Sequence, residues 1–213
     1  MKKTIQMMLV IGMLFACPVM NAQNRALEKA LKNQYKGKMK ELKKENWKLF
    51  GSSHTLEVEL LTHYDKLNRL GDKAVEFTGF ATKFKSKTVG KQMAMNSACI
   101  TYAQSAGNHV KGRMVVDMAG DGIDVEKEFE HFYAAYESSV SKEIKGELQE
   151  SYSVIRDYGD GTFEMQTIFI VDEEAASQAR IRAFENAMRE SAMAQKHAEM
   201  VSKFIQEGFE VEQ

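Results

Sequence analysis

The spacing of apolar residues predicts five helices. Apolar side chains recur every three or four positions over residues 25–48, 56–67, 88–107, 125–145 and 173–206. The fourth stretch has the strongest pattern, formed by Val125, Phe129, Phe132, Tyr133, Tyr136, Val140 and Ile144. We expect this aromatic face to cover a sheet rather than to line a ligand groove, because large apolar side chains are usually buried.

Alternating apolar and polar residues predict strands over residues 74–84 and 110–116 and a hairpin over residues 147–156 and 162–171. The first hairpin strand is expected to place Leu148, Tyr152 and Val154 on one face. Strands joined by a tight turn are antiparallel. The sequence therefore predicts an α+β, two-layer domain: a mostly antiparallel sheet of about four strands, packed by helices on one face, with a long C-terminal helix.

Residues 1–22 have the pattern of a secretory leader. Lys2 and Lys3 precede an apolar run that is too short to cross a membrane reliably. Cleavage after Ala22 would release a soluble chain, although Met20 is bulky for its position. Cleavage before Cys17 would leave 1–16 as the leader and make Cys17 a lipidation candidate, although Phe15 is bulky for a lipobox. Both routes predict export to the periplasm or the outer membrane.

Charge is distributed unevenly along a chain that is nearly neutral overall. The net charge is −1, and removal of residues 1–22 takes away two lysines and no acids, which argues against general nucleic-acid binding. Residues 25–48 nevertheless hold nine basic and three acidic residues. The pattern favours a helix that packs by its apolar stripe with its lysines in water, and the alternative is an arm that attracts anionic lipid or another acidic polymer.

The candidate metal-binding residues fit their patterns poorly. Asp117, Asp121 and Glu128 match positions one, five and twelve of a calcium-binding loop, but Ala119 and Asp124 depart from that pattern. A glycine-rich turn explains the same residues equally well, so the calcium site is a weak candidate. A soft-metal site formed by Met93, Met95, Cys99 and His109 is disfavoured. Met93 and Met95 are two positions apart on a helix, so their side chains point about 200° apart and cannot bind one ion. No cofactor is indicated.

No catalytic residues can be assigned from the sequence. Motifs such as G-x-S-x-G, H-E-x-x-H and a glycine-rich phosphate loop are absent, and the five histidines are scattered: His54, His63, His109, His131 and His197. Cys99 has no basic neighbour in sequence that would activate its thiol. A pocket that holds a histidine beside a serine, cysteine or carboxylate would favour an enzyme, and a closed apolar core would favour a binding module.

Residues 70–171 resemble a known family by pattern. The run AVEFTGFATKFKSKTVGKQMAMNSACITYAQSAGNHVKGRM and the later SYSVIRDYGDGTFEMQTIFIV are similar to the domain of Helicobacter-type small outer-membrane lipoproteins and flagella-associated lipoproteins. Ala94 and Ala98 match its alanine rhythm, and residues 161–171 match its late strand. The whole chain also resembles uncharacterised exported proteins of Bacteroides-like bacteria. The resemblance implies an envelope location and an interaction role, and it carries over no catalytic residues.

The sequence thus predicts three segments: a signal peptide over 1–22 (1–16 in a lipoprotein), a basic amphipathic helix over 23–50 and a single α+β domain over 51–213. We expect a non-enzymatic envelope protein that is a structural or partner-binding module. The alternative is a periplasmic enzyme, hydrolase-like, of unknown reaction. The expected partner is an envelope protein or polymer rather than nucleic acid, with membrane association possible through a lipid at Cys17. The oligomeric state stays open.

Overall fold

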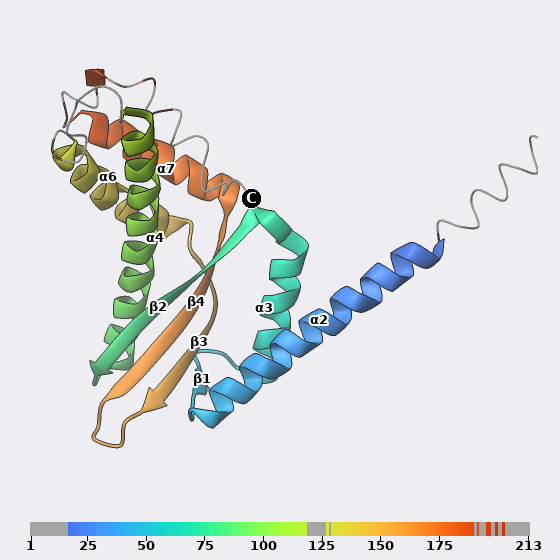
Figure 1. Cartoon of the computed structure of the whole chain (residues 1–213). Helices are drawn as coiled ribbons and strands as arrows, with labels where there is room; N and C mark the ends of the chain where they lie inside the picture. The colour runs from blue at the N-terminus through green and yellow to red at the C-terminus, as the bar shows by residue number, and fades with distance from the viewer. Residues whose placement is uncertain are drawn as a thin grey trace, which may run out of the picture.

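The computed structural model describes residues 17–118, 127, 129–189, 191, 195–196, 199 and 202. Its elements, in chain order, are α2 (Cys17–Lys44), β1 (Lys48–Phe50), α3 (Leu56–Leu70), β2 (Ala74–Phe84), α4 (Lys87–Met118), α6 (Glu130–Glu143), β3 (Gln149–Asp157), β4 (Phe163–Asp172) and α7 (Glu173–Met188) (Figure 1). Short 3₁₀ turns at Gly71–Lys73 and Ile144–Gly146 lead into β2 and β3.

The four strands form one antiparallel sheet in the order β1-β3-β4-β2. Side chains of β4 alternate between its two faces. Ile168 packs with residues of α2 and α3, whereas Phe169 and Val171 pack with residues of α4, α6 and α7. Helices therefore lie on both faces of the sheet.

The α+β class with a four-stranded antiparallel sheet is confirmed. Helices on both faces add one layer to the two that the sequence predicts, because α3 and the C-terminal half of α2 cover the face opposite α4. Strand 74–84 has the predicted bounds. The predicted C-terminal helix begins at α7, but the prediction of one helix to residue 206 is wrong, because α7 ends at Met188, Arg189 caps it and Ser191 is not helical. Helical residues follow at Gln195, Lys196, Glu199 and Ser202, and the other residues from 190 to 206 lie outside the described ones.

The larger core lies between the sheet and α4, α6 and α7. The aromatic face of α6 is buried there, with Phe132 and Tyr136 stacked at 5.9 Å between ring centroids. Small side chains on the facing helices, such as Ala98 on α4 and Ala183 on α7, are also fully buried. The prediction that this aromatic face is buried core is confirmed for Phe129 to Ile144, whereas Val125 lies outside the described residues. The face packs mainly on α4 and α7, so the prediction that it covers the sheet directly is wrong.

The predicted strand 110–116 is wrong, because α4 continues through it to Met118. Val110 and Met114 are buried four residues apart, and the Tyr133 hydroxyl of α6 donates a hydrogen bond to the Met114 sulfur at 3.5 Å. Burial of residues four positions apart is the period of a helix face. Adjacent valines favour a strand only through their local propensity, which the contacts of the helix override here. The fourth strand of the sheet is β1, whose three residues pair with Ser153, Val154 and Ile155.

A β-bulge in β3 changes which side chains share a face. The register with β4 slips between Glu150 and Tyr152, so Ser151 is an extra residue without a partner in the ladder. Leu148 consequently packs into the core beside α4, whereas Tyr152 and Val154 pack beneath α2 and α3. The prediction that these three residues share one face is wrong for Leu148.

Candidate functional site

A buried histidine joins three elements on the face covered by α3. His63 on α3 is 1% exposed, its Nδ1 lies 3.0 Å from Ser151 Oγ on β3, and its Nε2 lies 2.7 Å from Glu76 Oε2 on β2. The rings of Tyr64 and Tyr152 approach the imidazole edge-on, with centroids 5.0 and 5.2 Å away. The bulge turns Ser151 toward α3 beside Tyr152 and so makes this contact possible.

The His63 centre has the side-chain types of a serine–histidine–acid triad but not its access. A catalytic histidine must take the serine proton and then deliver it to a leaving group. The neighbouring open pocket, of about 460 Å³, is lined by Ser151 and Tyr152 but not by His63, whose ring is enclosed by protein. A leaving group in the pocket therefore has no route to the imidazole. The hydrogen bonds of His63 to Ser151 and Glu76 instead join α3 to the sheet, and we call them the polar tie.

The polar groups around this pocket are paired with one another. Glu59 accepts a hydrogen bond from Ser52 Oγ at 2.5 Å and lies 3.0 Å from His54 Nδ1. Lys91 pairs with Glu150 at 2.8 Å, and Ser153 donates to the same carboxylate at 2.8 Å. The contacts of Glu59 hold the β1–α3 loop to α3, and the Lys91–Glu150 pair holds α4 to β3.

We expect His63→Leu to lower the free energy of unfolding by about 1–3 kcal/mol, because the two hydrogen bonds of the buried imidazole, to the half-buried Ser151 and the 41% exposed Glu76, are lost. Urea unfolding followed by circular dichroism measures the loss. The matched control is His54→Leu, because His54 also contacts a carboxylate but is exposed, and its change should stay below about 1 kcal/mol. Equal midpoints for His63→Leu and wild type would contradict the polar tie.

The residues suggested as metal ligands do not form a metal site in the described part of the chain. Asp117 lies in the last turn of α4, and Asp121 and Glu128 lie outside the described residues. Within the described ranges, no three His, Cys, Asp or Glu side chains are grouped closely enough to hold a metal ion. Cys99 is buried in the larger core, and burial raises the pKa of its thiol, whereas Met93 is on the exposed side of α4.

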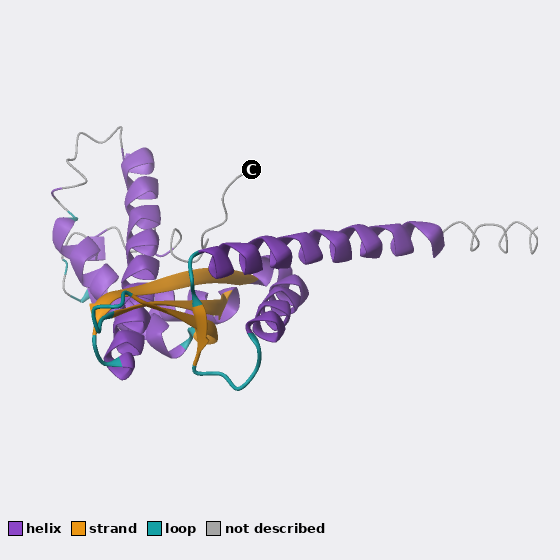
Figure 2. Ribbon diagram, turned by 90° about the horizontal axis from the view of Figure 1, so that it is seen from below, coloured by secondary structure: helices purple, strands orange, loops and turns teal. Residues whose placement is uncertain are grey.

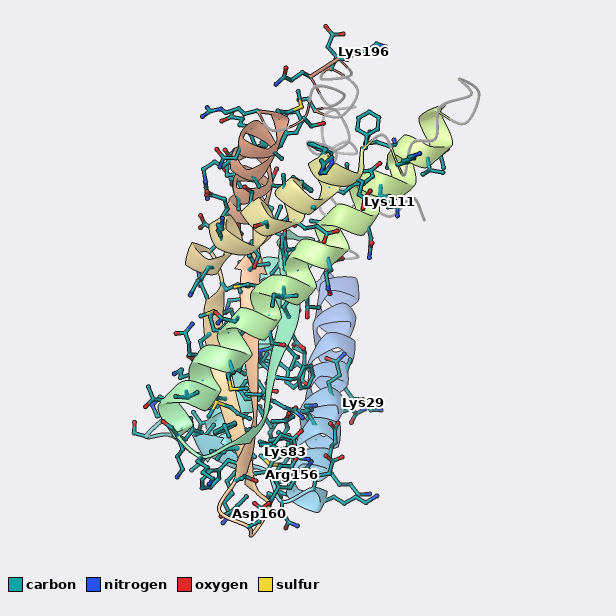
Figure 3. All side chains as sticks on the ribbon, turned by 90° about the vertical axis from the view of Figure 1, so that its left-hand side faces the viewer. Lys29, Lys83, Lys111, Arg156, Asp160 and Lys196 are labelled. Atoms are coloured by element: carbon teal, nitrogen blue, oxygen red, sulfur yellow. The ribbon has the colours of Figure 1, made fainter. Side chains whose placement is uncertain are left out.

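One face of α2 carries a row of lysines, the basic stripe, formed by Lys29, Lys32, Lys36, Lys40 and Lys43. All five side chains are exposed, and at 100° per residue they fall within an arc of about 80°. No ion pair within the described residues involves any of them, whereas Lys38, outside the stripe, pairs with Glu41 at 2.8 Å. Lys29 extends from α2 on the side away from the sheet (Figure 3).

Only the C-terminal half of α2 packs against the body of the protein. Tyr35 and Leu42 are buried with Trp47 and Leu60, so the predicted packing by an apolar stripe is confirmed for this half. The helix does not break at Gly37, and its N-terminal half projects beyond α3 and the sheet (Figures 1 and 2). Cys17, the lipidation candidate, is the first residue of this projecting half.

None of the described helices is long and apolar enough to serve as a membrane span. Comparison of the chain with protein-family models, with curated proteins and with solved structures found no match.

Proposed function

We propose that this protein is a non-enzymatic exported protein of the cell envelope, in the periplasm or at the outer membrane, that acts as a structural or partner-binding module. In this proposal α2 holds the α+β body at the anionic surface of a phospholipid membrane. The observation that carries it is the basic stripe: five exposed lysines on one side of a helix that projects from the body. The leader pattern of residues 1–22 supports export.

Electrostatic attraction is sufficient for such attachment. A lysine near an anionic membrane contributes about 1 kcal/mol, and the contribution falls off within a Debye length. The five lysines lie on one helical face and can approach a flat surface together, although the chain as a whole has a net charge of −1. The apolar residues Tyr35 and Leu42 are already buried in the protein, so α2 would lie on the headgroups without inserting them.

The contacts of His63 favour the binding module over the enzyme. A hydrolase would need its histidine open to a substrate, and here the imidazole is enclosed by Tyr64, Tyr152, Ser151 and Glu76. The enzyme alternative therefore gains no support from His63. The exposed group of Ser52, His54 and Glu59 has the same side-chain types, but there the serine hydroxyl donates to the glutamate and not to the histidine ring.

We expect the mature chain from Gln23 to cosediment with vesicles that contain anionic phospholipid, and not with vesicles of neutral phosphatidylcholine. Replacing the five lysines of the basic stripe by glutamine should weaken binding at least about 100-fold, because most of the charge that faces the membrane is lost. Binding by the wild type should also fall as salt is added. The mature chain is used because the apolar leader would itself bind lipid.

A matched variant separates the basic stripe from total charge. Glutamine at five exposed lysines elsewhere changes the net charge equally: Lys48, Lys73, Lys85, Lys142 and Lys145. This control should bind anionic vesicles nearly as tightly as wild type. If both variants bind equally, or the stripe variant binds as tightly as wild type, α2 does not hold the protein at the membrane.

A further inference from the structure

The middle of α4 has no charged side chain. Residues 92–108 include no Asp, Glu, Lys or Arg, although such residues make up 28% of the chain. Seventeen helical residues span about 25 Å. Surfaces that stay in water are usually studded with charges, whereas the centres of protein interfaces are depleted of them. The outward side of this segment, the α4 face, therefore has the composition of an interface.

Large apolar side chains point outward along this α4 face. Val89, Met93 and Ile100 are 53%, 42% and 50% exposed, and they follow one another at helical spacing. The inward side of the same helix carries small residues such as Ala94 and Ala98, which let α4 approach the sheet closely. Tyr102 of this segment is buried, but Met93 and Ile100 are left on the outward side, where about half of each side chain faces water unless another protein surface covers it.

The α4 face is also self-complementary. A two-fold axis that passes between Asn96 and Ser97 would pair Met93 with Ile100 of a second copy, and Val89 with Gln104 of that copy. Neither pair contains a charged side chain, so no charge on these four residues would lose its hydration. Ile100 and Gln104 also border a groove of about 460 Å³ between α4 and α6, whose α6 side carries the charged residues Glu137 and Lys142, so the uncharged contact is made by α4 itself.

We propose that two copies of this chain pair through antiparallel α4 helices. A second copy fits residues 92–108 better than a charged partner, because the same residues of the second copy bring an equally uncharged surface. The pairing would place two α2 arms on one assembly and so increase its avidity for a surface. It does not depend on membrane attachment, and its test contains no lipid.

Light scattering coupled to gel filtration tests the pairing directly. We expect the wild-type chain to have twice the monomer mass and Ile100→Lys to have the monomer mass, because the substitution sets two charges close to the two-fold axis. The matched control is Val58→Lys, since Val58 on α3 is 44% exposed, and it should remain a dimer. Circular dichroism checks that both variants fold, as is expected for half-exposed positions.

Disulfide trapping locates the contact without relying on mass. With Cys17 replaced by serine, Asn96→Cys should form an intermolecular disulfide under mild oxidation, because the two copies of residue 96 lie near the axis. Asn68→Cys, at an exposed position on α3, should not. A wild-type monomer at every concentration, or an Ile100→Lys chain that stays dimeric, would overturn the proposal.

Discussion

Gly79→Ala should lower the free energy of unfolding by about 3 kcal/mol, at the upper end of what overpacking usually costs. Gly79 lies in β2 where the strand passes beneath α4, and a Cβ atom there would lie 1.9 Å from the carbonyl oxygen of Ala94 and 2.7 Å from its carbonyl carbon. A further 3.2 Å contact would form with Cβ of Ala98. Because two of these neighbours are backbone atoms, no rotamer change relieves the overlap, and α4 must move away from the sheet.

Urea unfolding of the wild type and the variant measures this loss, and the control comes from the same helix. Gly112 lies in α4, and a Cβ atom added there would meet no other atom within 4 Å, so Gly112→Ala should be neutral or stabilising by up to about 1 kcal/mol. Destabilisation by Gly112→Ala as large as that by Gly79→Ala would mean that α4 responds to substitution generally. An unchanged midpoint for Gly79→Ala would rule out the close approach of β2 and α4.

The parts of the fold that the sequence predicts well are those with a strong local pattern, and the contact at Gly79 is one example. Glycine in β2 and alanines four residues apart in α4 meet at one crossing, and both patterns are visible in the sequence before the structure. The bounds of β2, the hairpin of β3 and β4 and the aromatic face of α6 follow from local periodicity in the same way. These elements are long or strongly patterned, so tertiary contacts do not override their local preference.

The errors arise where a long-range contact decides the outcome. Val115 and Val116 suggest a strand, but burial of Val110 and Met114 against α6 keeps the segment helical. The bulge at Ser151 leaves no local signal, and one extra residue moves every later side chain to the other face. A three-residue edge strand such as β1 is too short to have a detectable period.

The candidate sites also differ in how much of each one the sequence alone could show. The lysines of the basic stripe can be counted in the sequence. Only the structure shows that none of the five forms an ion pair within the described residues and that the helix projects from the body. His63 is 88 residues from Ser151, and the sequence around it predicts only an amphipathic helix, so no local pattern could have identified the polar tie. The outward position of Met93 and Ile100 depends on which side of α4 meets the sheet, and the small residues decide that.

Arg180→Ala should lower the free energy of unfolding by about 3–5 kcal/mol, because it removes a buried charged side chain together with its hydrogen bonds to Tyr102 and Glu173. Arg180 on α7 is 3% exposed; its Nη1 donates to the Tyr102 hydroxyl at 2.6 Å and its Nη2 to Glu173 at 2.5 Å. Burial raises the pKa of Tyr102 to about 12, although Arg180 opposes the rise, so the phenol is neutral at ordinary pH and accepts this hydrogen bond. Truncation also leaves a cavity between α4 and α7.

Arg182, two residues later, is the matched control for this loss. It makes two ion pairs, with Glu143 at 2.7 Å and Glu147 at 2.9 Å, but its side chain is 45% exposed. Water screens such pairs, so Arg182→Ala should cost no more than about 1 kcal/mol. If the number of ion pairs determined stability, Arg182→Ala would be the more damaging change in urea unfolding. We expect Arg180→Ala to be the more damaging change, since the loss of stability follows the burial of the arginine. Equal losses for the two variants would refute this explanation.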